Sequence, residues 1–188
     1  MKILKSSLGY SVIELMIATV LTGIISMAGF RFYVQMHNQT IAQEEISDMQ
    51  QRSRSALNEM SRTLRMAGYK IDSHSPYVIN NDTLYVFFND TQPVDTVIYY
   101  LSESTEDTEF DEEESAPIYS LMMKRNSDSP TVYADYISNL EFDVIDASSI
   151  EIVLEVQATK PDEAFNQNDG IRTFANSEIV TMRNLTFE

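Results

Sequence analysis

The sequence contains no cysteine, and it has 13 lysines and arginines against 29 aspartates and glutamates. The absence of cysteine excludes disulfide bridges, thiolate nucleophiles and zinc sites built on thiolates. The formal net charge of −16 disfavours direct nucleic-acid binding, because nucleic-acid backbones are themselves anionic. With 43% hydrophobic residues in 188, the chain can still bury the core of one domain.

Motifs of catalysis and cofactor binding are also missing from the sequence. It has no glycine-rich phosphate loop, no metal-spaced histidine cluster and no nucleophile elbow. Its two histidines, His37 and His74, are interpreted as surface residues. We therefore expect that the protein is not an enzyme and uses no cofactor or metal.

One long apolar run lies near the N-terminus. Residues 10–30 (YSVIELMIATVLTGIISMAGF) carry a single charge, Glu14. As a helix this run would be about 31 Å long, which matches the hydrocarbon core of a bilayer. Lys2 and Lys5 precede the run without an acid, so the positive-inside rule predicts a cytoplasmic N-terminus. Everything after Arg31 would then lie on the outer side.

A helical apolar period continues beyond this run. Apolar or small residues recur at steps of three and four on one face: Ile46, Met49, Ser53, Ala56, Met60, Leu64 and Ala67. No proline or glycine interrupts residues 30–67, and Gly68 follows Arg62 and Arg65, which is typical of a helix end. The sequence predicts one helix from about Ser11 to Ala67.

After Gly68 the apolar period changes to two. The expected strands are residues 77–79, 83–88, 94–101, 118–124, 136–145, 150–157 and 179–186. We therefore expect an α+β fold in which the second half of the helix packs on an antiparallel sheet. The expected organisation is a short basic segment at 1–9, a transmembrane helix at 10–30, an amphipathic helix at 31–68 and a β domain at 69–188.

Two polar loops interrupt the expected sheet, and both are expected to be mobile. Residues 103–114 (ESTEDTEFDEEE) carry eight acids and no base. Their carboxylates could bind calcium, but they lack the EF-hand spacing and its glycine turn, so a solvated loop is the simpler interpretation. The second loop, residues 160–173, contains Pro161 and Gly170.

The most informative motif is Gly9-Tyr10-Ser11-Val12-Ile13-Glu14, which follows a short basic leader. It resembles the class III signal of type IV prepilins and pseudopilins, in which a membrane peptidase cuts after the glycine and N-methylates the new first residue. The resemblance implies a pilin-like fold with a leader peptide at 1–9 and a filament-core helix at 10–30. It implies cleavage between Gly9 and Tyr10 and methylation of Tyr10. It also implies a role in subunit assembly for Glu14. Gly23 fits the family pattern, whereas Arg31 replaces the proline of many major pilins.

The position of Glu14 is consistent with this resemblance on physical grounds. A carboxylate at the centre of a membrane helix costs about 2.5–3.5 kcal/mol on insertion scales, and less near the edge. A new amine on Tyr10, of the same or a neighbouring subunit, would supply the counter-charge. Three alternatives stay open: a plain single-span anchor, a secretory signal cut near Ser26-Met27-Ala28, and a membrane-tethered enzyme or binding domain.

Later segments resemble the minor pilins of the PilW type. They are Leu64–Tyr69, Tyr99–Ser102, Ile118–Tyr119, Lys124–Arg125, Ile137–Phe142, Ile150–Val156 and Val180–Leu185. J-type minor pseudopilins of type II secretion share much of this layout, but Met66-Ala67-Gly68-Tyr69 favours the PilW type. Glu14 disfavours the tip subunit of secretion systems, which lacks this glutamate.

The resemblance implies a low-abundance subunit that starts filament assembly from the inner membrane. Its partners would be the prepilin peptidase, the other minor pilins, the major pilin, the inner-membrane assembly platform and the lipid bilayer. The protein would first span the inner membrane once and then enter a pilus or pseudopilus. Cell adhesion or protein secretion would be roles of that filament.

Overall fold

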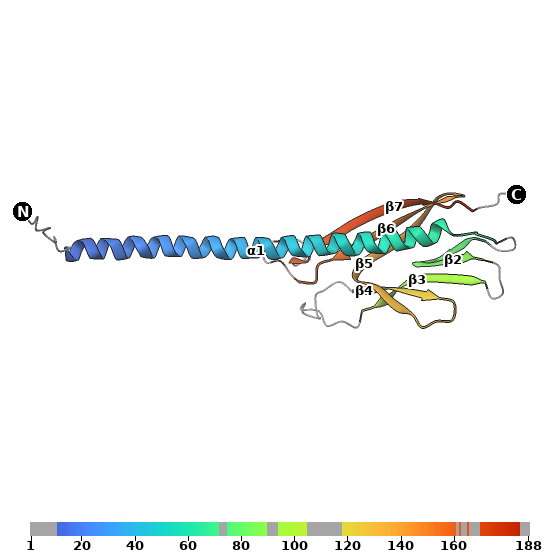
Figure 1. The fold of residues 1–188 in the computed structure, drawn as a ribbon, viewed down its shortest axis with the longest axis horizontal. Coiled ribbons are helices and arrows are strands. Elements are labelled where there is room, and N and C mark those ends of the chain that lie inside the picture. The colour runs from blue at the N-terminus through green and yellow to red at the C-terminus, as the bar shows by residue number, and fades with distance from the viewer. Residues whose placement is uncertain are drawn as a thin grey trace, which may run out of the picture. The chain divides into compact units, whose positions relative to one another are not determined.

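The computed structural model of the protein describes residues 11–71, 75–89, 94–104, 118–160, 162, 165 and 170–184. The chain divides into two compact units, Met1–Gln43 and Glu44–Glu188. A single helix, α1 (Val12–Arg65), contributes to both units (Figure 1). Its bounds confirm the expected helix to within two residues at the C-terminal end.

Seven strands form one antiparallel sheet in the second unit. They are β1 (Tyr77–Asn80), β2 (Thr83–Phe88), β3 (Asp95–Glu103), β4 (Tyr119–Arg125), β5 (Thr131–Asp146), β6 (Ser149–Gln157) and β7 (Thr173–Thr181). Each strand pairs with the next in chain order, so β1 and β7 are the two edges. Figure 1 shows the sheet curled against the helix segment of this unit. The expected α+β fold is confirmed.

Two strands differ from their expected bounds by more than two residues. β5 begins at Thr131 and not at residue 136, because residues 131–137 pair with β4. Residues 137–146 pair with β6, and a bulge lies between the two parts of the strand. β7 was expected at residues 179–186, which is wrong by six residues at its start. Ala175, Asn176 and Ser177 in its first half have low strand propensity, and nine regular pairs with β6 hold this strand in place.

The core lies between one face of α1 and the inner face of the sheet. The buried apolar residues of α1 are Met49, Ala56, Leu57, Met60 and Leu64. They pack with the alternate buried residues of the strands, such as Leu84, Tyr99 and Leu154. This stripe confirms that the second half of the helix is amphipathic, as its three-and-four spacing predicted.

The turn after α1 explains why a glycine stands at position 68. Gly68 has φ +77°, a conformation that side chains with a Cβ rarely adopt. Its N–H donates to the carbonyl of Phe87 at 3.0 Å. A Cβ at this position would lie 2.7 Å from the carbonyl oxygen of Asn184. Gly68 therefore allows the helix end, β2 and the C-terminal segment to approach closely.

Candidate membrane and assembly helix

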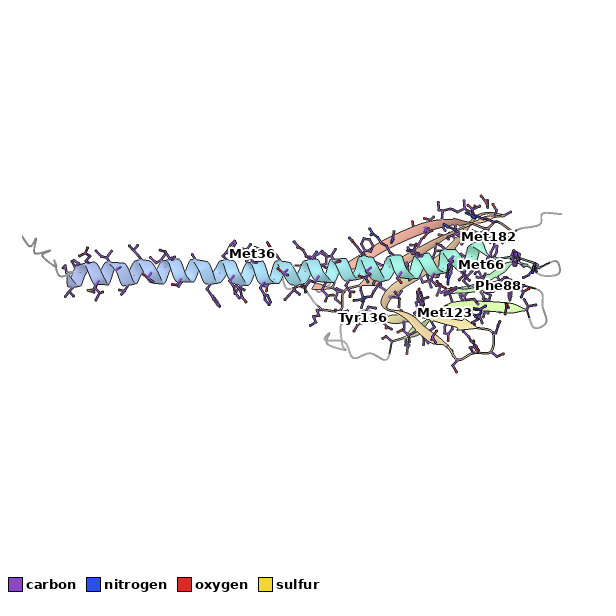
Figure 2. All side chains as sticks on the ribbon, viewed as in Figure 1. Met36, Met66, Phe88, Met123, Tyr136 and Met182 are labelled. Atoms are coloured by element: carbon purple, nitrogen blue, oxygen red, sulfur yellow. The ribbon has the colours of Figure 1, made fainter. Side chains whose placement is uncertain are left out.

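The helix of the first unit has an apolar surface on every side. Its large apolar side chains between Val12 and Ile41 are 39–76% exposed, and Figure 2 shows side chains projecting all around this part of α1. By length and composition this stretch can cross a membrane, and a signal sequence near an N-terminus would meet the same criterion. The expected apolar span is thus present as a helix, which is a weak sign of membrane anchoring.

Three threonine hydroxyls along the exposed part of α1 donate to carbonyl groups of the preceding turn. Thr19 Oγ1 donates to the carbonyl of Met16 at 2.9 Å, and Thr22 Oγ1 donates to that of Ala18 at 2.7 Å. Thr40 Oγ1 does the same with Met36 at 2.9 Å. Such bonds back to the preceding turn let a threonine face hydrocarbon without an unpaired hydroxyl.

Glu14 is the acidic residue in the first turn of α1. This turn begins with a backbone bond of 3.1 Å from the N–H of Leu15 to the carbonyl of Ser11. Glu14 is exposed, and it makes no ion pair within the part of the chain that the structure describes. Gly9 and Tyr10, the expected cleavage and methylation site, lie outside the described residues. The pairing of Glu14 with an amine stays a prediction.

In the second unit, polar contacts join the helix segment to the sheet at both of its ends. Near its start, Glu45 accepts hydrogen bonds from the N–H of Thr159 at 3.0 Å and from Thr159 Oγ1 at 2.7 Å. Near its end, Arg65 forms an ion pair of 3.3 Å with Glu178 in β7. Thr159 lies just after β6 and therefore beside the start of β7. The start of the helix segment is thus near the start of β7 and its end is near Glu178, so the two run in the same direction.

Between these ends, Arg52 joins the helix to the bulged strand β5. Its guanidinium lies 5.0 Å from the ring centre of Tyr136, and its Nε donates to Asp48 Oδ2 at 3.0 Å. Tyr136, labelled in Figure 2, has φ +59°, which is rare for an aromatic residue. The sequence did not reveal this contact, since nothing local indicates a bulge at Tyr136.

The loop of residues 160–173, expected to be mobile, has specific contacts at its described residues. Asp162 accepts two hydrogen bonds from Arg172, of 2.9 Å from Nε and 2.7 Å from Nη2. The same guanidinium lies 4.5 Å from the ring centre of Phe165. The N–H of Asp162 donates to the carbonyl of Gly170 at 2.8 Å. These contacts connect the two ends of the loop.

The sequence offered two further candidates for a ligand site, the histidines and the acidic loop. Among the described residues no group of three histidines and carboxylates is placed to hold a metal ion. His37 lies on the exposed helix, with its ring parallel to that of Tyr33 at 6.2 Å. His74 and nearly all of the acidic loop lie outside the described residues, so the interpretation of that loop stays a prediction.

Comparisons with protein-family models, curated proteins and solved structures found no match to this chain.

Proposed function

We propose that this protein is a minor pilin of the PilW type, a low-abundance structural subunit that helps to initiate assembly of a type IV pilus. One observation carries the proposal. A single helix has a first part that is apolar on all sides, with Glu14 in its first turn, and a second part that packs on an antiparallel sheet. The protein is then a structural subunit and not a catalyst.

The exposed apolar surface of the helix favours two apolar surroundings in turn, first the lipid bilayer and then the filament core. Water is unfavourable for so many exposed apolar side chains, because each Å² of apolar surface costs about 25 cal/mol. Lipid would cover them while the subunit is stored in the inner membrane. Neighbouring apolar helices would cover them in the filament core, where shape and small residues decide the packing.

Glu14 supplies specificity to this packing. Apolar contacts alone discriminate weakly between axial registers of packed helices. A carboxylate paired with the N-methylated amine of Tyr10 on an adjacent subunit would fix one axial position. The prepilin peptidase must act first, because the leader otherwise occupies the place of that amine.

The proposed partners are the prepilin peptidase, the other minor pilins, the major pilin and the inner-membrane assembly platform. A J-type role in a type II secretion pseudopilus is the alternative, because that group shares the glutamate and the order of the β segments. A retraction ATPase gene nearby would favour the pilus, and a secretin gene in an exoprotein cluster would favour secretion.

Intact-mass analysis of the chain from membrane or filament fractions tests the proposal. We expect the mature protein to begin at Tyr10 and to carry one methyl group. A Gly9→Val variant is the control, which should remain at full length and be absent from filaments. A wild-type protein that still begins at Met1 indicates a plain anchor or a tethered domain. One that begins at Gly29 indicates a secretory signal.

A further inference from the structure

In the part of the chain that the structure describes, the strand β7 leaves one edge of the sheet without a partner. The N–H of Ala158 donates to the carbonyl of Arg172, and the N–H of Met182 donates to that of Ser148, both at 2.8 Å. Hydrogen-bonded positions alternate along an antiparallel pair, so the even-numbered residues of β7 bond to β6. The odd-numbered residues direct their N–H and C=O groups away from the sheet. They are Thr173, Ala175, Ser177, Ile179 and Thr181.

This edge has none of the features that usually protect a free strand. Within the described residues, no hydrogen bond reaches the outward backbone groups of β7. The strand contains no proline, glycine, lysine or arginine, and its pairing with β6 has no bulge. Its one charged residue, Glu178, is engaged by Arg65 of α1. The opposite edge, β1, has only four residues.

The outer face of the sheet beside this edge is acidic. We call Glu141 and Asp143 of β5 and Glu151 and Glu155 of β6 the acidic face. Asp143 stands directly opposite Glu151 in the register, a like-charge pair that destabilises the sheet. None of these four carboxylates forms an ion pair within the described part of the chain, and no lysine or arginine occurs between Arg125 and Lys160.

The outer side chains of β7 differ in size beside the two acids of β6. Ala175 lies opposite Glu155, Ser177 lies opposite Val153 and Ile179 lies opposite Glu151. A lysine or arginine on a strand added beside β7 would therefore reach over the small Ala175 toward Glu155, whereas Ile179 lies between the edge and Glu151. On the inner face β7 presents Phe174 and Val180 near its two ends, with Asn176 and Glu178 between them. Apolar residues at alternate positions of the added strand would pack beside Phe174 and Val180.

We propose that the β7 edge binds an extended segment of another protein, added antiparallel to β7, in which basic and apolar residues alternate. Backbone hydrogen bonds would supply affinity, and the acidic face would select the basic residues. The antiparallel direction continues the existing sheet and is the more stable pairing. The free edge and the acidic face do not depend on the proposed function, whereas the choice against a second copy uses the parallel helices of the proposed filament.

A second copy of this chain is a poor occupant of the same edge. Because β7 runs in the direction of the helix segment of its unit, a copy with a parallel helix would offer β7 in parallel. It would also place its own acidic face beside the first, in a chain whose net charge is already −16. The partner is therefore a different protein.

The test uses the full chain in neutral detergent micelles and a fluorescent nine-residue peptide of alternating lysine and valine. We expect binding by fluorescence anisotropy, and none for the peptide with glutamate in place of lysine. N-methylation of the lysine amides should weaken binding about tenfold or more, because these amides face β7. N-methylation of the valine amides is the matched control and should change little.

Protein variants test the same edge from the other side. Ser177→Pro removes an outward N–H that β6 does not use, so the fold should persist while binding falls about tenfold or more. Glu151→Gln with Glu155→Gln should weaken binding several-fold and reduce its salt dependence. A spin label at Ala175→Cys should be immobilised by the peptide, whereas one at Val78→Cys on β1 should not.

Three results would overturn the proposal. The first is an absence of binding by the lysine peptide. The second is binding that ignores both Ser177→Pro and lysine N-methylation, which would indicate charge attraction alone. The third is self-association of the chain that Ser177→Pro abolishes, which would make a second copy the occupant.

Discussion

Tyr99 joins the helix to the sheet through a buried hydroxyl. Its side chain is fully buried, and its Oη shares a hydrogen bond of 2.9 Å with Oγ1 of Thr63. Burial raises the pKa of Tyr99 to about 12, although the bond from Thr63 opposes this shift. The folded state therefore favours the neutral phenol more strongly than the unfolded chain does.

The shift at Tyr99 predicts a loss of stability in alkali. Below pH 10 both states keep the proton, so stability is unaffected. Between about pH 10 and pH 12 the unfolded chain loses the proton first, and the free energy of unfolding falls by roughly 2–3 kcal/mol in total. Tyr99→Phe should remove this slope and cost about 1 kcal/mol at neutral pH.

Urea denaturation of the chain in micelles at pH 7, 10 and 11, followed by near-UV circular dichroism, measures this effect. Tyr69→Phe is the matched control, because Tyr69 is 50% exposed and its loss should leave the alkaline slope in place. An equal slope in wild type and Tyr99→Phe would disprove the role assigned to the buried phenol.

Gly68 provides a second prediction for a single residue. In Gly68→Ala a Cβ would meet the carbonyl of Asn184 at 2.7 Å while the backbone keeps φ +77°. We expect a loss of about 2–4 kcal/mol, from strain and from displacement of the C-terminal segment. Thermal unfolding measures it.

Gly23→Ala serves as the control for Gly68→Ala. Gly23 lies in the exposed helix, and no atom lies within 4 Å of the position that an alanine Cβ would occupy, so alanine should not lower stability there. Similar melting temperatures for Gly68→Ala and wild type would contradict the close approach seen at the helix end.

At the scale of elements, the pairing between β3 and β4 predicts that the acidic loop is dispensable for folding. Glu103 pairs with Tyr119, and the N–H of Ser104 donates to the carbonyl of Ile118 at 2.9 Å. Ser104 and Ile118 therefore occupy the last pair before the loop. Replacing residues 105–117 by Asn-Gly would leave a two-residue turn of the type that antiparallel hairpins favour.

We expect the Asn-Gly replacement to change the melting temperature by only a few degrees, because shortening a surface loop has a small effect on free energy. Added calcium should not stabilise either protein. If calcium raises the melting temperature of the wild type by several degrees and leaves the replacement unchanged, the acidic loop is a calcium site and the solvated interpretation is wrong.

At the scale of the whole molecule, the proposed function requires Glu14 to act between subunits. Glu14→Val makes the span more apolar, so membrane insertion should be at least as good. The variant should still be clipped after Gly9. It should nevertheless enter filaments poorly, since the counter-charge of the Tyr10 amine is lost.

Complementation tests this by scoring filament number and co-purification with the other minor subunits. Ile13→Val, a change at the neighbouring position without loss of charge, is the control and should behave as wild type. A plain anchor predicts no defect for Glu14→Val. A fully functional variant with normal co-purification would therefore reject the assembly role of this carboxylate.

The sequence alone determined the long helix, the change of period after Gly68 and the antiparallel class of the sheet. Each follows from local spacing of apolar residues, which a helix or strand repeats wherever it lies. The position of Glu14 in the first turn was predictable for the same reason. The apolar run also defined the membrane-length stretch without any tertiary information.

Only the tertiary structure decided the bulge at Tyr136, the start of β7 at Thr173 and the contact between Glu45 and Thr159. These features join residues that are distant in the chain, and Ala175, Asn176 and Ser177 of β7 are in a strand because β6 pairs with them. The free edge of β7 follows from the same order of strands. Local propensity contains no information about which strand is left without a neighbour.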